Sequence, residues 1–179
     1  LDGESMALPD LFWIVATQNS LEFEGTYPLP KAQLDRFLFK LLVGYPEPQA
    51  ERQMLLNAQA GLQTKRLDLE RLKPLASAED LLRARQAVRS VRVTDPLLDY
   101  LLALVQRTRQ SPDLVLGASP RSAVAWLQVS KAKAWLSGRE YVTPDDIKAT
   151  AAPLLRHRLI LRPETQLDGL KAVSYTHLT

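Results

Sequence analysis

Ile14-Val15-Ala16-Thr17-Gln18-Asn19 is the stretch that decides the fold: an apolar run rich in β-branched residues ends abruptly in polar side chains. Such a run is typical of a buried strand, and we expect this strand to cover Leu11 to Thr17. Ligands of open α/β sheets sit outside the carboxyl ends of the strands. Asn19 therefore lies where a side chain that faces a ligand would be.

Two arginines further along stand in settings that also suit an anion. Arg36 lies in an amphipathic segment, Ala32 to Phe39, which would carry its guanidinium to a surface. Arg121 stands second in a helix that Ser119-Pro120 opens, where free N–H groups already carry partial positive charge. A cation is unfavourable there unless an anion is shared, and phosphate binds readily at helix N-termini. Together with Asn19, these arginines indicate a phosphate-sensing protein.

A Pro-rich hinge, Gly44 to Pro48, separates the strands from a helical half. Before it, the apolar run Phe37 to Val43 predicts a second strand. After it, start signals predict five helices, one over Glu47 to Ala60 and the others opening at Ser77, Thr94, Ser119 and Thr143. The helix from Ser119 should end near Ser137, because Gly138 follows. We therefore expect short strands followed by a helical bundle.

Three segments resemble the MoxR family of AAA+ ATPases: ATQNSLEFEGTYPLPKAQLDRF at Ala16 to Phe37, GASPR at Gly117 to Arg121, and GREYVTPDDIKATAAPLLRHRLIL at Gly138 to Leu161. The resemblance implies an α/β remnant of a AAA+ core, with one or two strands, followed by an all-α helical-bundle lid domain. It places the core part at 1–45, the lid at 46–165 and a tail at 166–179. From Val173 the tail continues no periodic pattern, so both native sequence and a cloning scar stay open.

The resemblance implies a role for each of the three polar residues. Asn19 would be sensor 1, whose uncharged amide orients the water that attacks the γ-phosphate. Arg36 would be the arginine finger, which acts on the nucleotide of the neighbouring subunit, with Asp35 restraining or orienting it. Arg121 would be sensor 2, contacting nucleotide in cis from the lid. The ordinary alternatives are a turn-forming Asn, a surface Asp–Arg pair and an arginine that extends into solvent.

The function that the resemblance implies is ATP hydrolysis, with Mg²⁺, in a ring that is expected to be a hexamer in the cytoplasm. Hydrolysis would drive chaperone-like remodelling or maturation of other proteins, with von Willebrand factor A domain proteins among the partners. The alternatives are a chelatase-type AAA+ motor subunit and a non-catalytic helical binding module. The 179 residues contain no G-x-x-x-x-G-K-[ST]. We therefore expect this chain to be the C-terminal portion of a longer ATPase. Alone, it should be inactive and bind no cofactor tightly.

Composition excludes several other classes. The net charge of +3 is too small to argue for nucleic acid, and the absence of cysteine excludes disulfides and Cys-based zinc sites. No apolar run approaches the roughly 20 residues that span a bilayer. His157 and His177 lack the spacing of a metal site, and we expect no metal ligands in this chain.

The remaining charged and aromatic residues have ordinary explanations. Arg156-His157-Arg158 lies near a helix C-terminus, where cations complement the helix dipole. Trp126 and Trp135 should pack rather than stack on a ligand. A helix surface in contact with solvent is expected to carry Arg83, Arg85, Arg89 and Arg92.

Overall fold

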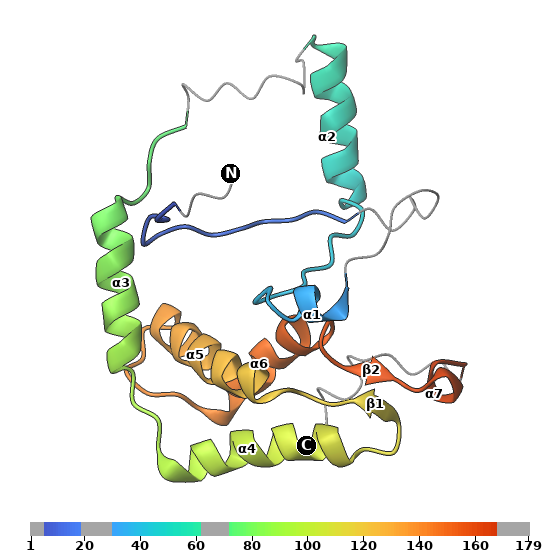
Figure 1. Cartoon of the computed structure of the whole chain (residues 1–179). Coiled ribbons are helices and arrows are strands. Elements are labelled where there is room, and N and C mark those ends of the chain that lie inside the picture. Colours follow the sequence, from blue (N-terminus) through green and yellow to red (C-terminus); the bar gives the residue numbers. More distant parts are fainter. Residues whose placement is uncertain (1–5, 19–29, 62–71, 168–179) are drawn as a thin grey trace. The chain divides into compact units, whose positions relative to one another are not determined.

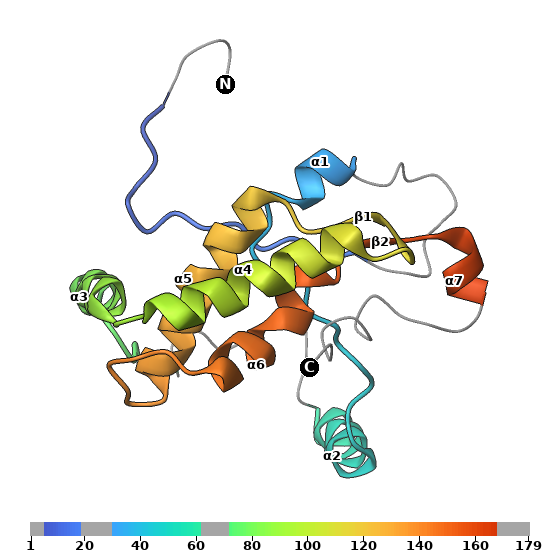
Figure 2. The ribbon, with the colours of Figure 1, turned by 90° about the horizontal axis from the view of Figure 1, so that it is seen from below.

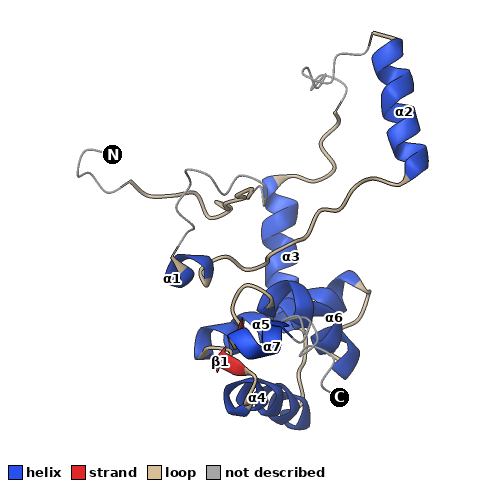
Figure 3. Ribbon diagram, turned by 90° about the vertical axis from the view of Figure 1, so that its right-hand side faces the viewer, coloured by secondary structure: helices blue, strands red, loops and turns tan. Residues whose placement is uncertain are grey.

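The structure is a computed structural model that describes residues 6–18, 30–61 and 72–167. The contacts of the chain divide it into two compact units, one of Leu1–Lys40 with Ala78–Thr179 and one of Leu41–Ser77. Helices dominate the described residues (Figure 3).

The first unit is built around a helical bundle of α3 (Ala78–Ser90), α4 (Asp95–Gln110), α5 (Pro120–Leu136) and α6 (Pro144–Leu155). α5 lies against α6 in the most extensive contact, and both α3 and α4 also touch α5 (Figures 1 and 2). The core is apolar, and Val105, Ala134 and Leu154 in it are 0% exposed. The lid expected from the sequence is therefore mostly helical, as predicted.

The helix termini lie where the sequence placed them because their caps form. The Ser119 hydroxyl accepts a hydrogen bond of 3.1 Å from the Ser122 N–H at the start of α5. At its end Gly138 adopts a φ of +74°, a conformation that favours glycine. α6 begins similarly, since the Asp146 carboxylate accepts hydrogen bonds of 2.9 Å from both the N–H and the hydroxyl of Thr143.

Trp126 is a packing residue, as predicted. Its ring is 2% exposed, and its Nε1 donates a hydrogen bond of 2.9 Å to the Ile147 carbonyl of α6. Beside it Ser130 and Thr150, both buried, satisfy their hydroxyls on carbonyls of their own helices. The α5–α6 contact thus buries polar groups only with partners.

A small antiparallel sheet closes one end of this unit. β1 (Leu114–Leu116) pairs with β2 (Ile160–Leu161), Leu114 lying opposite Leu161 and Leu116 opposite Ile160. The short helices α1 (Lys31–Leu34) and α7 (Pro163–Leu167) complete the first unit. The expectation that everything beyond the hinge is helical is wrong here, because strands this short leave no periodic pattern to read.

The two strands expected before the hinge do not form. Residues 11–17 and 37–43 are described and belong to no strand, with Trp13 79% and Val43 95% exposed. A strand is stabilised by its ladder, and the described residues supply neither run with a partner. The chain is thus a small α/β fold in which the only described sheet lies in the first unit, beside the helical bundle.

The second unit contains α2 (Pro48–Gln59), the helix predicted over Glu47 to Ala60. It has no buried residue, and Met54, Leu55 and Leu56 are exposed. α2 therefore buries none of its own side chains. The division into core, lid and tail at residues 45 and 165 stays a prediction.

None of the helices in residues 6–18, 30–61 and 72–167 has the length and apolar character required to cross a membrane.

Candidate functional site

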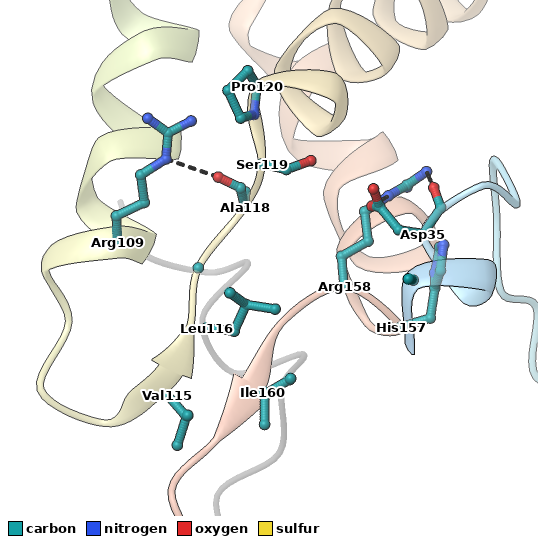
Figure 4. Close-up of a pocket in the computed structure, with 12 residues that line it drawn as sticks. Asp35, Arg109, Val115, Leu116, Ala118, Ser119, Pro120, His157, Arg158 and Ile160 are labelled. Carbon is teal, nitrogen blue, oxygen red and sulfur yellow. Dashed lines mark hydrogen bonds and ion pairs between the residues drawn. The ribbon is translucent and has the colours of Figure 1, made fainter. Parts of the chain in front are cut away.

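A cavity of about 590 Å³ lies where the sheet, the start of α5 and the turn after α1 meet. Figure 4 shows its lining, with Asp35 facing Arg158 and Arg109 directed toward Ala118. The cavity is lined by Ala32, Asp35, Arg109, Val115, Leu116, Gly117, Ala118, Ser119, Pro120, His157, Arg158 and Ile160. Apolar strand residues thus form one part of the wall, and charged groups form another.

The loop between β1 and α5 is hydrogen-bonded to the end of α4. The Ala118 N–H donates to the buried Thr108 hydroxyl at 2.9 Å, and Arg109 Nε donates to the Ala118 carbonyl at 2.8 Å. Gly117 fits against the same turn, where an added Cβ would lie 2.6 Å from the Thr108 carbonyl oxygen. This close approach requires glycine and fixes where α5 begins.

Asp35 is the anionic centre of the site. Its carboxylate lies 3.0 Å from Arg158 Nε and 3.8 Å from an Nη of Arg121, and its side chain is 27% exposed. The two arginines differ in setting, because the side chain of Arg158 is 3% exposed and that of Arg121 is 64% exposed. Burial lowers the pKa of Arg158, and Asp35 opposes that shift. The guanidinium stays charged, as arginine does throughout proteins.

His157 lies beside Arg158 and faces the same segment. Burial lowers the pKa of His157 and so favours the neutral ring. Its Nε2 is 2.9 Å from the Phe37 carbonyl, which can only accept, so Nε2 carries the proton. Nδ1 is then a buried acceptor, and it has no partner among the described residues.

The structure brings two of the three predicted site residues to one region. Arg121 lies at the start of α5 beside the cavity and pairs loosely with Asp35. Arg36 lies in the turn that follows α1, exposed and adjacent to Asp35 in sequence. The ion pairs of Asp35 join it to Arg158 and Arg121. The expectation that Asp35 restrains or orients Arg36 stays a prediction. Asn19 lies outside the described residues.

Sequence reasoning missed Arg158. It was expected to complement the dipole of α6, but its guanidinium is buried and reaches across to Asp35. A signal existed, since Arg158 is four residues after Leu154, which belongs to the buried face of α6. An arginine on a buried face needs partners, but the sequence does not reveal that residues 123 positions away supply them.

The charged groups at the start of α5 suit an anion. Arg121 holds an exposed guanidinium at the N-terminal end of α5, where helix N–H groups also favour negative charge. Within the part of the chain that the structure describes, no three His, Cys, Asp or Glu residues are grouped to hold a metal. The exposed cation at this helix end therefore favours an anionic ligand.

Comparison with known proteins identifies the class. The family model described as "ATPase family associated with various cellular activities (AAA)" matches residues 1–39, and the AAA lid domain model matches residues 106–174. A crystal structure described as "a putative ATPase from Cytophaga hutchinsonii" superposes with a TM-score of 0.83 at 31% identity, covering 97% of this chain and 54% of that one. The fold is that of a AAA+ ATPase.

Relatives narrow the class to one family. The chain is 36% identical to "Chaperone MoxR1" of Mycobacterium tuberculosis over 95% of its length and 46% of the relative. It is 29% identical to "Protein MoxR" of Methylorubrum extorquens (89% and 51%) and 45% identical to "Uncharacterized protein YeaC" of Bacillus subtilis (96% and 52%). The chain belongs to the MoxR family of AAA+ ATPases. It spans about half the length of the curated relatives it matches.

Proposed function

We propose that this chain is the sensor and lid portion of a subunit that hydrolyses ATP in a ring and uses the energy to remodel partner proteins. The observation that carries the proposal is the cluster at the start of α5. There the cation of Arg121 lies beside a cavity and 3.8 Å from Asp35, the neighbour of Arg36. The family of ATPases to which the chain belongs supports this reading.

Each site residue has a proposed role. Arg121 and the N-terminal end of α5 would contact the phosphates of ATP bound in the same subunit. Arg36 would reach the nucleotide of the adjacent subunit and stabilise charge that develops on the transferring phosphoryl group. Asn19 would orient the attacking water. Bound Mg²⁺ would neutralise phosphate charge, and the described residues offer no ligand set for it.

The remodelling role rests on similarity. The relative named "Chaperone MoxR1" matches 95% of this chain. We extend that description to this chain as a proposal, together with a hexameric ring and a partner of the von Willebrand factor A domain type. A chelatase-type motor would use the same sensors on a different client.

Turnover by an Arg36→Ala variant of the intact ATPase tests the proposal. Because the finger acts on transition-state charge, kcat should fall by about 10³-fold or more while ATP affinity changes little. Arg83→Ala is the matched control, since Arg83 is an exposed arginine whose ion pairs stay within α3. If Arg36→Ala hydrolyses ATP at the parent rate, the finger role is wrong. That result would favour the alternative of a non-catalytic helical binding module.

A further inference from the structure

The segment that carries Arg36 has no regular structure of its own to hold it. α1 ends at Leu34, and the chain then runs through a turn without pairing as a strand. In this turn the Arg36 N–H donates to the Gln33 carbonyl, and the Phe37 N–H donates to the Leu34 carbonyl. The carbonyls that follow need donors from elsewhere, because unpaired backbone groups are costly.

Those donors come from the lid. Arg158 Nη2 donates to the Phe37 carbonyl at 2.7 Å and to the Asp35 carbonyl at 3.2 Å, and Nη1 donates to Leu38 at 3.0 Å. His157 Nε2 donates to the same Phe37 carbonyl, and the Lys40 N–H reaches back to α6. Residues 35–40 are thus held at the C-terminal end of α6.

The guanidinium of Arg158 suits this task, and an ammonium would not. It presents a planar fork of five N–H donors, and here Nε, Nη1 and Nη2 are all in use. Nη1 also donates to the Leu154 carbonyl, one of those that a helix end leaves free. Lysine offers a single nitrogen and could not reach these acceptors together.

Of the two arginines that meet Asp35, Arg158 is the fixed one. Its side chain is 3% exposed, so a charge there persists only because it is fully paired. Arg121 is largely exposed and 3.8 Å away, a distance at which it can leave for a phosphate without releasing Asp35. The position of the Arg36 turn therefore depends on Arg158.

We propose that Arg158 is a positioning residue for the arginine finger: the lid holds the backbone on both sides of Arg36 and so presents its exposed side chain to the adjacent subunit. This inference rests on the proposed role of Arg36. A finger works by being placed before charge develops, and a displacement of about 1 Å can cost about a hundredfold in rate. The lid would thus act on its own nucleotide through Arg121 and on the neighbour's through Arg158.

Amide hydrogen exchange in the 179-residue chain tests the structural half of the proposal. Arg158→Lys should speed exchange at the Arg36 and Phe37 amides while α5 stays protected. Arg156→Lys is the matched control, because the recorded hydrogen bond of Arg156 side chain stays within its own turn, at Ala152. If Arg158→Lys does not fold, Asp35→Asn, which keeps the side-chain volume, takes its place. Unchanged exchange at Arg36 and Phe37 in a folded variant overturns the proposal.

Turnover by the intact ATPase tests the functional half. Arg158→Lys should lower kcat by roughly tenfold to a hundredfold with the KM for ATP unchanged. In an Arg36→Ala background, Arg158→Lys should cause no further loss of kcat, because Arg158 acts through Arg36. An equal loss in both backgrounds, or an unchanged kcat, overturns the positioning role while leaving the finger intact. A parent rate for Arg36→Ala alone overturns the proposed function itself.

Discussion

Asp35 joins the turn that carries Arg36 to two arginines of the helical unit. Its tight contact with Arg158 is buried, and its loose contact with Arg121 is exposed. Exposed pairs contribute about 0 to 1 kcal/mol, so the Arg121 pair alone stabilises little. In the proposed function, Arg121 would therefore exchange Asp35 for a phosphate at little cost.

Arg121→Ala in the intact ATPase should weaken ATP binding by about 10- to 100-fold, the range expected for a hydrogen bond to a charged group. Lys133→Ala is the control, since this lysine is exposed in the last turn of the same helix. Equilibrium binding of ATP measures the effect. Unchanged affinity and unchanged turnover in Arg121→Ala would remove this residue from the site.

Asp146 makes the bundle sensitive to acid. Its hydrogen bonds with Arg139 lower its pKa to about 2, and those from Thr143 act in the same direction. A depressed carboxyl pKa stabilises the fold above the ordinary pKa near 4, and that contribution is lost as the pH falls toward 2. Asp146→Asn should therefore lower the free energy of unfolding at pH 7 by about 2 kcal/mol.

Urea unfolding of the chain between pH 7 and pH 2 measures this difference. The gap between parent and Asp146→Asn should close below about pH 4. Asp145→Asn, an exposed neighbour, should follow the parent throughout. A difference in unfolding free energy between parent and variant that stays constant down to pH 2 would mean that ionisation of the Asp146 carboxyl does not contribute this stability.

At the scale of elements, the loop between β1 and α5 sets where Arg121 lies. Gly117→Ala would place a Cβ 2.6 Å from the Thr108 carbonyl oxygen and 2.7 Å from the backbone of Arg109. We expect a loss of about 1–3 kcal/mol in unfolding free energy, because backbone atoms must shift. Gly44→Ala is the control, since nothing lies within 4 Å of its added Cβ. Equal thermal stability of the two variants would contradict the close approach.

The helix boundaries were predictable because their signals are local. Ser119, Thr143 and Gly138 act on backbone groups within one turn, so the sequence alone locates α5 and α6. The strands were not, because a ladder depends on partners distant in sequence. Arg158 was missed for the same reason, since its acceptors lie about 120 residues earlier. In the site, the sequence suggested Asn19, Arg36 and Arg121, whose roles stay predictions, but it did not reveal which side chains meet Asp35.

α2 has no buried residue, whereas α4, α5 and α6 each have several. Local stability follows burial, so its amides should exchange much faster than those of α5. Hydrogen exchange of the 179-residue chain, followed by mass spectrometry, compares the two helices directly. Protection of α2 equal to that of α5 would show that it packs on something in this chain.

At the scale of the whole molecule, the central claim is that one chain serves two nucleotide sites. Arg121 would contact ATP in its own subunit, and Arg36, held by Arg158, would complete the site of the next. In the proposed function, neither role is complete in a single subunit, and activity would belong to the interface between copies. The chain covers about half of its relatives' length.

Mixed rings test that claim most directly. One subunit carries Arg36→Ala, and the other carries an intact Arg36 with a disabled phosphate loop, each inactive in a ring of its own. Because the finger acts in trans, mixing them should restore part of the ATP turnover, at interfaces where an intact loop meets an intact Arg36. Rings that demonstrably contain both subunits and regain no turnover would contradict the account, and Arg36 would then be an ordinary exposed arginine.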